Sequence, residues 1–240
     1  MYALGNHSGA GTAVDAKGPI AFAIGWVKKE IAQWGATTFR LRTDSENAII
    51  ALAAAIQQQW SHPVLLQQTP QNSPQSIRGV ARFHQSLQGQ VRTSTFEVEK
   101  HLNISINPKS DAATWIVRHA SWIYFRFAMS RTLKTTAHMR TTGRSYQGPL
   151  VHLFETILVK IAPTAEDKWR GVWRFALRLG RAEVSDDHSL FLEGTVQRHR
   201  CIRRLSLADA RRWDGEAVRA LRVTPLRLKQ AELGDEGRVV

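Results

Sequence analysis

The sequence predicts an α/β fold followed by a small antiparallel β-barrel. Helical and strand-like hydrophobic periods alternate over about residues 12–105, which is typical of α/β proteins. Over about residues 150–205 only the strand-like alternation remains, and turn residues interrupt it at regular intervals. The 240 residues are 43% hydrophobic and 22% charged, so the chain can bury a sizeable core and wholesale disorder is excluded.

The first elements are expected to be a loop, a strand, a helix and a second strand. Residues 2–11 are rich in Gly, Asn and Ser and predict a loop, and residues 11–16 predict a short strand. Pro19 opens a helix over residues 20–34, because branched apolar side chains recur there at helical spacing. Residues 37–43 alternate and are rich in β-branched and aromatic side chains, which favours a strand.

This strand leads directly into a second helix over residues 47–60. Asp44 or Ser45 is expected to cap that helix, since both residue types are preferred at this position. Residues 64–66 form a short apolar run that predicts a further strand, and residues 67–75 have no hydrophobic period and predict a loop.

Two longer helices and a basic loop follow. Apolar residues keep one stripe from about residue 76 to residue 102, which predicts a long amphipathic helix. Ser110 and Asp111 are expected to cap another helix over residues 112–130. Residues 135–148 are basic and polar and predict a loop.

The last third of the chain predicts four strands and a tail. Alternating runs occur over residues 155–161, 169–179, 189–192 and 195–202, and short turns separate them. The tail is expected to pack over the barrel or to fray. The predicted organisation is residues 1–110 as an α/β core, 111–148 as a basic helix and loop connector, 149–206 as the small β-barrel and 207–240 as the tail.

Positive charge is concentrated in two segments. The chain carries 33 Lys and Arg against 20 Asp and Glu, a formal net charge of +13, and no acidic residue lies between Asp111 and Glu155. Such segments are either solvated faces that keep the protein soluble or surfaces that contact nucleic-acid phosphates, and both readings stay open. The two basic segments are Arg118, Arg126, Arg131, Lys134, Arg140 and Arg144, and then Arg198, Arg200, Arg203, Arg204, Arg211 and Arg212.

Several classes of protein are excluded. The single cysteine, Cys201, excludes an internal disulfide and a Cys-rich zinc site. His199 and Cys201 lie on one strand face and are soft-metal ligands, but two ligands do not make a site. No run of apolar residues is long enough for a membrane span, and the first residues do not predict a secretory signal, so we expect an intracellular protein. Four tryptophans, Trp115, Trp122, Trp169 and Trp173, are expected in the core.

Asp44 is the first candidate site residue because it follows directly on a predicted strand. Active groups collect at the carboxyl edge of open α/β sheets, and a carboxylate there is a suitable ligand for Mg²⁺. The alternative is that Asp44 or Ser45 only caps the next helix. Both interpretations remain open on the residues alone.

Five segments in order carry a resemblance to the integrases of retroelements, especially the copia type. Residues 41–49, with the string Leu-Arg-Thr-Asp-Ser-Glu-Asn-Ala-Ile, resemble the segment that holds the second catalytic acid. Residues 71–76 resemble the polar loop before the last catalytic helix, and residues 79–87 resemble that helix. Residues 150–155 and 198–204 resemble the β-rich segment downstream of the core in degenerate copia-type polyproteins.

The resemblance implies a partial RNase H-like core in residues 1–110. Such enzymes use three carboxylates to hold two Mg²⁺ or Mn²⁺ ions about 4 Å apart during phosphodiester transfer. Asp44 matches the second acid, and Ala81 stands where the third acid is expected. The chain begins too late to hold the first acid, and Asp15 is interpreted as a turn residue. Asp44 alone is expected to bind the metal weakly, so the chain looks like a truncated or decayed integrase without catalytic activity.

The resemblance also implies DNA, or RNA, as the partner, with oligomerisation and a nuclear location as further expectations. Two other functions stay open: a nucleic-acid-binding module unrelated to integrases, and a protein–protein interaction domain whose charge serves only solubility. Phosphate contacts without base readout are expected from Arg78, Arg82, Arg92, Arg118, Arg140 and Arg144.

Overall fold

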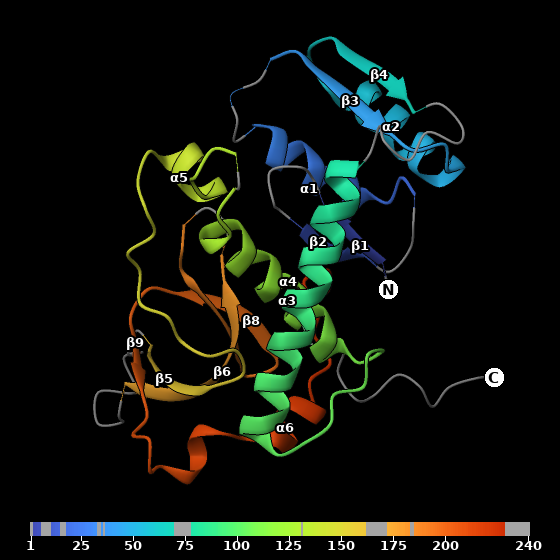
Figure 1. Ribbon diagram of the computed structural model, residues 1–240. Coiled ribbons are helices and arrows are strands. Elements are labelled where there is room, and N and C mark those ends of the chain that lie inside the picture. Colours follow the sequence, from blue (N-terminus) through green and yellow to red (C-terminus); the bar gives the residue numbers. More distant parts are fainter. Residues whose placement is uncertain are drawn as a thin grey trace, which may run out of the picture. The chain divides into compact units, whose positions relative to one another are not determined.

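The protein is described by a computed structural model that divides into two compact units (Figure 1). Unit 1 comprises Met1–Gln90 and Ile123–Tyr146, and unit 2 comprises Val91–Trp122 and Gln147–Val240. Each unit is described by itself, and the four-segment organisation expected from the sequence stays a prediction. The structure describes residues 2–5, 11–14, 18–32, 35, 37–69, 78–130, 132–161, 172–182 and 185–228.

Unit 1 is a mixture of helices and two small sheets. The short strands β1 and β2 form an antiparallel pair, and β3 and β4 form a parallel pair in which Phe39 lies opposite Val64. β1 is a correction, because a loop was expected there. The elements are β1 (Tyr2–Gly5), β2 (Gly11–Val14), α1 (Ala21–Ala32), β3 (Phe39–Thr43), α2 (Asn47–Gln59), β4 (Val64–Gln68), α5 (Ala137–Thr142), and parts of α3 (Arg78–Leu102) and α4 (Asp111–Phe127).

The helix α2 connects the parallel strands β3 and β4, as parallel pairing requires. Its apolar stripe packs against the apolar stripe of α1, with Ile24, Leu52 and Ile56 buried between them. Leu41 of β3 joins this cluster, which explains the helical spacing read from the sequence. The mixed α/β class is therefore confirmed for this part of the chain. Among the described residues, the strands of unit 1 belong to two separate sheets, and the RNase H-like assignment remains a proposal.

Unit 2 contains one five-stranded antiparallel sheet with the strand order β8-β7-β6-β5-β9. A bulge between Arg178 and Gly180 shifts the register of β6 on β7. The elements are β5 (Thr156–Lys160), β6 (Trp173–Arg181), β7 (His188–Leu192), β8 (Thr195–His199), β9 (Ile202–Arg204), the 3-10 helix η2 (Ala210–Arg212), α6 (Gly215–Arg219), and the remaining parts of α3 and α4.

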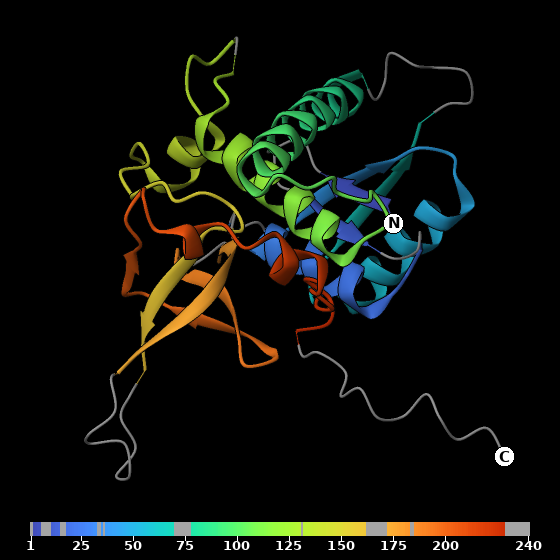
Figure 2. The ribbon, with the colours of Figure 1, turned by 90° about the horizontal axis from the view of Figure 1, so that it is seen from below.

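The expected closed barrel is not present among the described residues. The strands β8 and β9 are the two edges of the sheet, and no ladder joins them. Only two residues separate His199 from Ile202, so these strand ends lie within about 11 Å, and the sheet is strongly twisted (Figure 2). Helices cover the apolar residues Leu177 and Leu179 on one face of this open sheet.

The core of unit 2 lies between the sheet and the helices. Val98 and Leu102 of α3 and Trp115 of α4 pack against Leu177 and Leu179 of β6. A second cluster on the other side of the sheet includes Ile157, Val159, Ala176, Leu190 and Leu192. The chain after β9 adds Val218, Leu221 and Val223 to the first cluster, and the Trp115 Nε1–H donates a hydrogen bond of 2.8 Å to the carbonyl of Val223. Residues 207–228 therefore belong to the folded part.

Candidate nucleic-acid interface

One face of the sheet in unit 2 presents aromatic and basic side chains to solvent. Leu158 of β5 lies opposite both Phe175 of β6 and Arg203 of β9, and Trp173 lies opposite Lys160. Residues that lie opposite each other in a ladder point to the same face, so these five side chains share one surface. Phe175 is 46% exposed, and Trp173 is half-buried. We call this surface, together with Arg211 of η2, the aromatic–arginine face.

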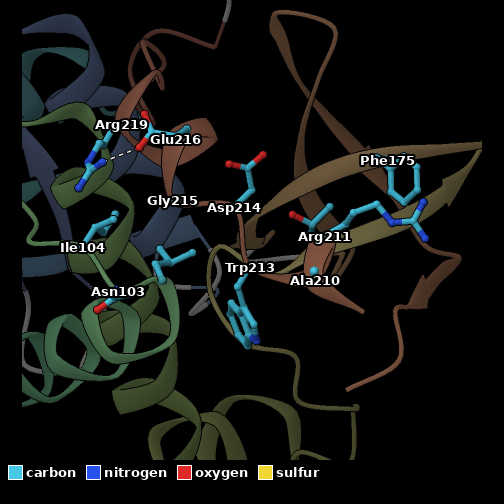
Figure 3. A pocket seen from close by; sticks show the side chains of 12 residues that line it. Asn103, Ile104, Phe175, Ala210, Arg211, Trp213, Asp214, Gly215, Glu216 and Arg219 are labelled. Atoms are coloured by element: carbon cyan, nitrogen blue, oxygen red, sulfur yellow. Dashed lines mark hydrogen bonds and ion pairs between the residues drawn. The ribbon is translucent and has the colours of Figure 1, made fainter. Parts of the chain in front are cut away.

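Two guanidinium groups lie over the aromatic rings of this face. The Cζ atom of Arg203 is 4.8 Å from the ring centroid of Trp173, and the Cζ atom of Arg211 is 4.8 Å from that of Phe175. Figure 3 shows the guanidinium of Arg211 beside the ring of Phe175. Such stacking is favourable because the ring face carries partial negative charge. Stacking leaves the edge of the Arg203 guanidinium available for an anion, whereas Asp209 occupies the Nε and Nη2 edge of Arg211 and leaves its Nη1.

A carboxylate fixes Arg211 in this position. Its Nη2 is 2.7 Å from Oδ2 of Asp209, and its Nε donates to Oδ1 at 2.9 Å. The side-chain hydrogen bond from Arg211 lowers the pKa of Asp209 to about 2, and the same bond raises the pKa of Arg211. Both groups therefore stay charged near neutral pH.

A buried carboxylate anchors the segments that carry the two stacked arginines. Glu155 is fully buried; Arg204 donates to both of its carboxylate oxygens at 2.9 Å, and Nε of Arg212 donates to Oε1 at 2.9 Å. Burial raises the pKa of Glu155, but the hydrogen bonds and charges of the two arginines outweigh it, so the pKa lies below its usual value. Arg212 is buried and the partly exposed Arg204 reaches the same buried carboxylate, whereas their neighbours Arg203 and Arg211 lie over the rings.

A hollow of about 650 Å³ adjoins the face between the end of α3, the sheet and the segment that follows β9 (Figure 3). Its charged groups are two arginines and two acids, so the hollow itself has no excess of positive charge. The lining residues are Leu102, Asn103, Ile104, Thr156, Phe175, Ala210, Arg211, Trp213, Asp214, Gly215, Glu216 and Arg219.

The expected metal ligand Asp44 lies at the carboxyl end of β3, as the sequence indicated. Its Oδ1 accepts a hydrogen bond of 3.2 Å from the Glu46 backbone N–H, and Ser45 donates to the carbonyl of Thr69. Glu46, whose side chain makes no capping hydrogen bond, is the N-cap of α2, so the expected cap by Asp44 or Ser45 is wrong. The local reason is that both side chains bond elsewhere in the turn.

A two-metal site does not fit the residues around Asp44. Ala81 is exposed on α3 and offers no oxygen. Within the described ranges, the one group of three His, Cys, Asp or Glu side chains close enough to share an ion does not include Asp44. Asp15 lies outside the described residues. No step of phosphodiester transfer is therefore derived for this chain.

The six arginines expected to contact phosphate are distributed over both units. Arg78 and Arg82 are exposed one turn apart on α3 in unit 1, so they share a helix face. Arg140 and Arg144 are exposed in and after α5 of the same unit. In unit 2, Arg92 is exposed on α3, whereas Arg118 is half-buried with its Cζ atom 5.6 Å from the ring centroid of Trp115. Their role stays a prediction.

The sequence interpretation missed the aromatic–arginine face. It placed Trp173 in the core, whereas Trp173 is half-buried under Arg203. Trp115 and Trp122 are buried as expected. Trp169 lies outside the described residues. The available signal was the alternation of β6, which places Trp173 and Phe175 on one strand face. Pairing of β5 with both β6 and β9 then brings Arg203 to that face, and a single sequence does not reveal strand order.

Comparisons with known proteins identify no family. No protein-family model and no curated protein matches the chain. A chain of the cryoEM structure of simian T-cell lymphotropic virus intasome in complex with PP2A regulatory subunit B56 gamma is similar over 83% of this chain and 71% of its own length, at 11% identity and a TM-score of 0.31. A likeness at this TM-score carries no argument.

Proposed function

We propose that this chain is a DNA-binding protein of the integrase-like kind, with a partial RNase H-like core, that performs no strand transfer. The observation that carries the proposal is the aromatic–arginine face, where Arg203 lies over the half-buried Trp173 and Arg211 over the exposed Phe175. The net charge of +13 adds a long-range attraction for a polyanion.

The chemistry of the face suits nucleic acid. Guanidinium groups bind phosphate through paired hydrogen bonds, and neither Arg203 nor Arg211 points into the core. The exposed ring of Phe175 offers a surface on which an unpaired base can stack. If the positive charge served only solubility, the arginines would not need to lie over aromatic rings. The proposal therefore favours DNA over a protein partner.

The proposed lack of strand transfer follows from the small number of carboxylates that could bind the metal ions. Two divalent ions in one small site need an anionic cluster to hold them. Asp44 supplies one carboxylate, and Ala81 supplies none at the position that resembles the third acid. DNA binding without chemistry is therefore the function that these residues support.

The test is DNA affinity after removal of the two outward arginines. In fluorescence anisotropy at fixed salt, the variant Arg203→Ala/Arg211→Ala should bind single-stranded and duplex DNA at least about tenfold more weakly, because two phosphate contacts are lost. The matched control Lys109→Ala/Arg222→Ala removes equal charge from exposed positions of unit 2 away from this face. It should lose much less affinity.

A third variant separates stacking from charge. Phe175→Ala removes no charge, so it should weaken binding of single-stranded DNA and leave duplex binding nearly unchanged. An RNA oligonucleotide of the same sequence tests whether the sugar matters. Equal losses in the Arg203/Arg211 variant and in its control would show that the face is not the binding site.

A further inference from the structure

Three side chains of unit 2 that are metal-ligand types converge beside Trp213. Glu97 and His101 are one turn apart on α3, and His152 lies in the segment before β5. One ligand atom from each lies within 4.8 Å of the other two, and Nδ1 of His152 is 2.6 Å from Oε1 of Glu97. The contact joins residues 55 positions apart in the sequence, so the fold and not local geometry creates the cluster.

Aromatic packing holds the two imidazole rings. The ring of His101 stacks on Trp213 with centroids 4.3 Å apart and planes only 5° apart. The ring of His152 meets both His101 and Trp213 edge to face, at 5.0 Å and 5.6 Å. These contacts restrict the rotation of both rings. The two side chains therefore lose less conformational entropy when a metal ion binds.

The backbone of His152 is also fixed. Its N–H donates to Oε2 of Glu155 at 3.4 Å, and its carbonyl accepts a hydrogen bond of 3.0 Å from Arg178. The helix turn that carries Glu97 and His101 is anchored as well, because Val98 and Leu102 of α3 are buried in the core of unit 2. The three donors therefore project from rigid parts of one unit.

The charge state of the cluster suits a cation. Partial burial is the main cause that lowers the pKa of His101, followed by the charge of His152, while Glu97 acts in the opposite direction. One ring nitrogen of His101 lies within 4.8 Å of the ligand atoms of Glu97 and His152, so it is placed to bind the same ion. Arg212 and Lys100 also face His101, but Arg212 is bound to the buried carboxylate of Glu155. Glu97 supplies the negative charge.

We propose that Glu97, His101 and His152 bind one zinc ion. Two imidazoles and one carboxylate form a ligand set that zinc accepts with water as its fourth ligand. Zinc–ligand bonds of about 2.0–2.1 Å place tetrahedral ligand atoms about 3.4 Å apart. The Glu97–His152 pair must open slightly, a movement that rotation of the exposed Glu97 side chain permits while the stacked rings stay in place. Zinc would replace the contact between Nδ1 of His152 and Oε1 of Glu97.

The site is independent of the proposed DNA-binding function, because none of its ligands belongs to the aromatic–arginine face. Zinc would tie α3 to the segment before β5 and so strengthen unit 2. The His199 and Cys201 pair is a separate candidate, and it does not join a group of three ligands among the residues described.

The experiment uses the full chain, stripped of metal with a chelator, and titrates it with Zn²⁺ by calorimetry. We expect one equivalent to bind. Glu97→Gln, His101→Gln and His152→Gln should each raise the dissociation constant at least about tenfold. The controls His62→Gln, at an exposed histidine in unit 1, and Cys201→Ser, at the exposed thiol, should bind as the unmodified chain does.

Co²⁺ provides a second readout, since tetrahedral coordination gives strong visible absorption bands. These bands should appear with one equivalent of Co²⁺ and be lost in the three ligand variants. Glu97→Gln is decisive, because residue 97 is exposed on a helix and the change leaves the fold intact. Failure of the unmodified chain to bind one equivalent, binding unchanged in Glu97→Gln, or binding abolished in Cys201→Ser would each overturn the proposal.

Discussion

Glu155 is the residue on which the geometry of the aromatic–arginine face depends. It is fully buried, and its partner Arg212 is only 4% exposed, so removal of the carboxylate leaves a buried cation without compensation. Glu155→Gln should lower the free energy of unfolding by about 3–5 kcal/mol. Urea denaturation followed by circular dichroism measures this loss. Glu216→Gln, in an exposed pair with Arg219, is the control and should change stability little. A loss as small as that of the control would show that Glu155 is not the anchor.

His119 makes the stability of the protein sensitive to acid. Burial, followed by the charge of Arg178, lowers its pKa to about 3 from about 6.5 in the unfolded chain. Between these pH values the imidazole binds a proton in the unfolded chain but not in the folded protein. The free energy of unfolding therefore falls as pH falls below 6.5. The loss attributable to His119 is about 2 kcal/mol between pH 7.5 and 5. His119→Phe, which keeps a ring against Trp122, should flatten the pH dependence of the urea midpoint; a slope equal to that of the unmodified chain would contradict this account.

Among the elements, α6 contacts the end of α3 too closely for any side chain at Gly215. A Cβ atom there would lie 2.8 Å from Cγ2 of Ile104 and 3.1 Å from the carbonyl oxygen of Leu102. Gly215→Ala should destabilise unit 2 by about 1–3 kcal/mol through this overlap. Gly25→Ala in α1 is the matched control, because a Cβ there meets nothing within 4 Å and the helix gains about 0.5–1 kcal/mol. Thermal unfolding of both variants measures the difference, and a stabilised Gly215→Ala protein would refute the packing argument.

The exposed face of α3 in unit 1 holds two arginines, Arg78 and Arg82, that are expected to contact phosphates. If Arg78 and Arg82 contact phosphates, Arg78→Ala/Arg82→Ala should flatten the plot of log affinity for duplex DNA against log salt by about 1.8, or 0.9 for each phosphate. The charge-matched variant Lys109→Ala/Arg222→Ala serves again as the control. A salt slope identical to that of the unmodified chain would remove both arginines from the interface.

Helices were the elements that the sequence predicted best. The apolar stripes of α1 and α2 meet each other in the structure, so their spacing alone was sufficient. The strand β1 was missed because the Gly- and Asn-rich start has no alternation, although β1 pairs with the next strand along the chain, β2. The barrel was predicted from strand number, but closure depends on pairing between the edge strands β8 and β9, which strand number does not reveal. The cluster of Glu97, His101 and His152 could be suspected only in part, since the i, i+4 spacing on α3 says nothing about a residue 55 positions away.

At the scale of the whole molecule, the chain should not cut or join DNA. Supplied with Mg²⁺ or Mn²⁺ and a labelled duplex, the unmodified protein should give no nicked product, because Asp44 is a single carboxylate. Ala81→Glu should strengthen Mg²⁺ binding but still give no product, since one acid remains missing. Robust metal-dependent cleavage that is lost in Asp44→Ala would show that the catalytic acids have been misassigned.

The described part of the chain offers no helix that combines the length and apolar composition needed to cross a membrane. The two proposals for unit 2 use different side chains. The zinc variants should therefore leave DNA affinity unchanged, and the Arg203→Ala/Arg211→Ala variant should leave zinc affinity unchanged.

The salt dependence of DNA binding by the unmodified chain tests the central claim most directly. Binding through the cations of the aromatic–arginine face releases counterions, so the logarithm of the association constant should fall linearly with the logarithm of salt concentration. Two phosphate contacts from Arg203 and Arg211 alone predict a slope of about −1.8 for duplex DNA, and further contacts make it steeper. No measurable binding at low salt, or a slope near zero, would contradict the proposal and favour a protein partner for this basic surface.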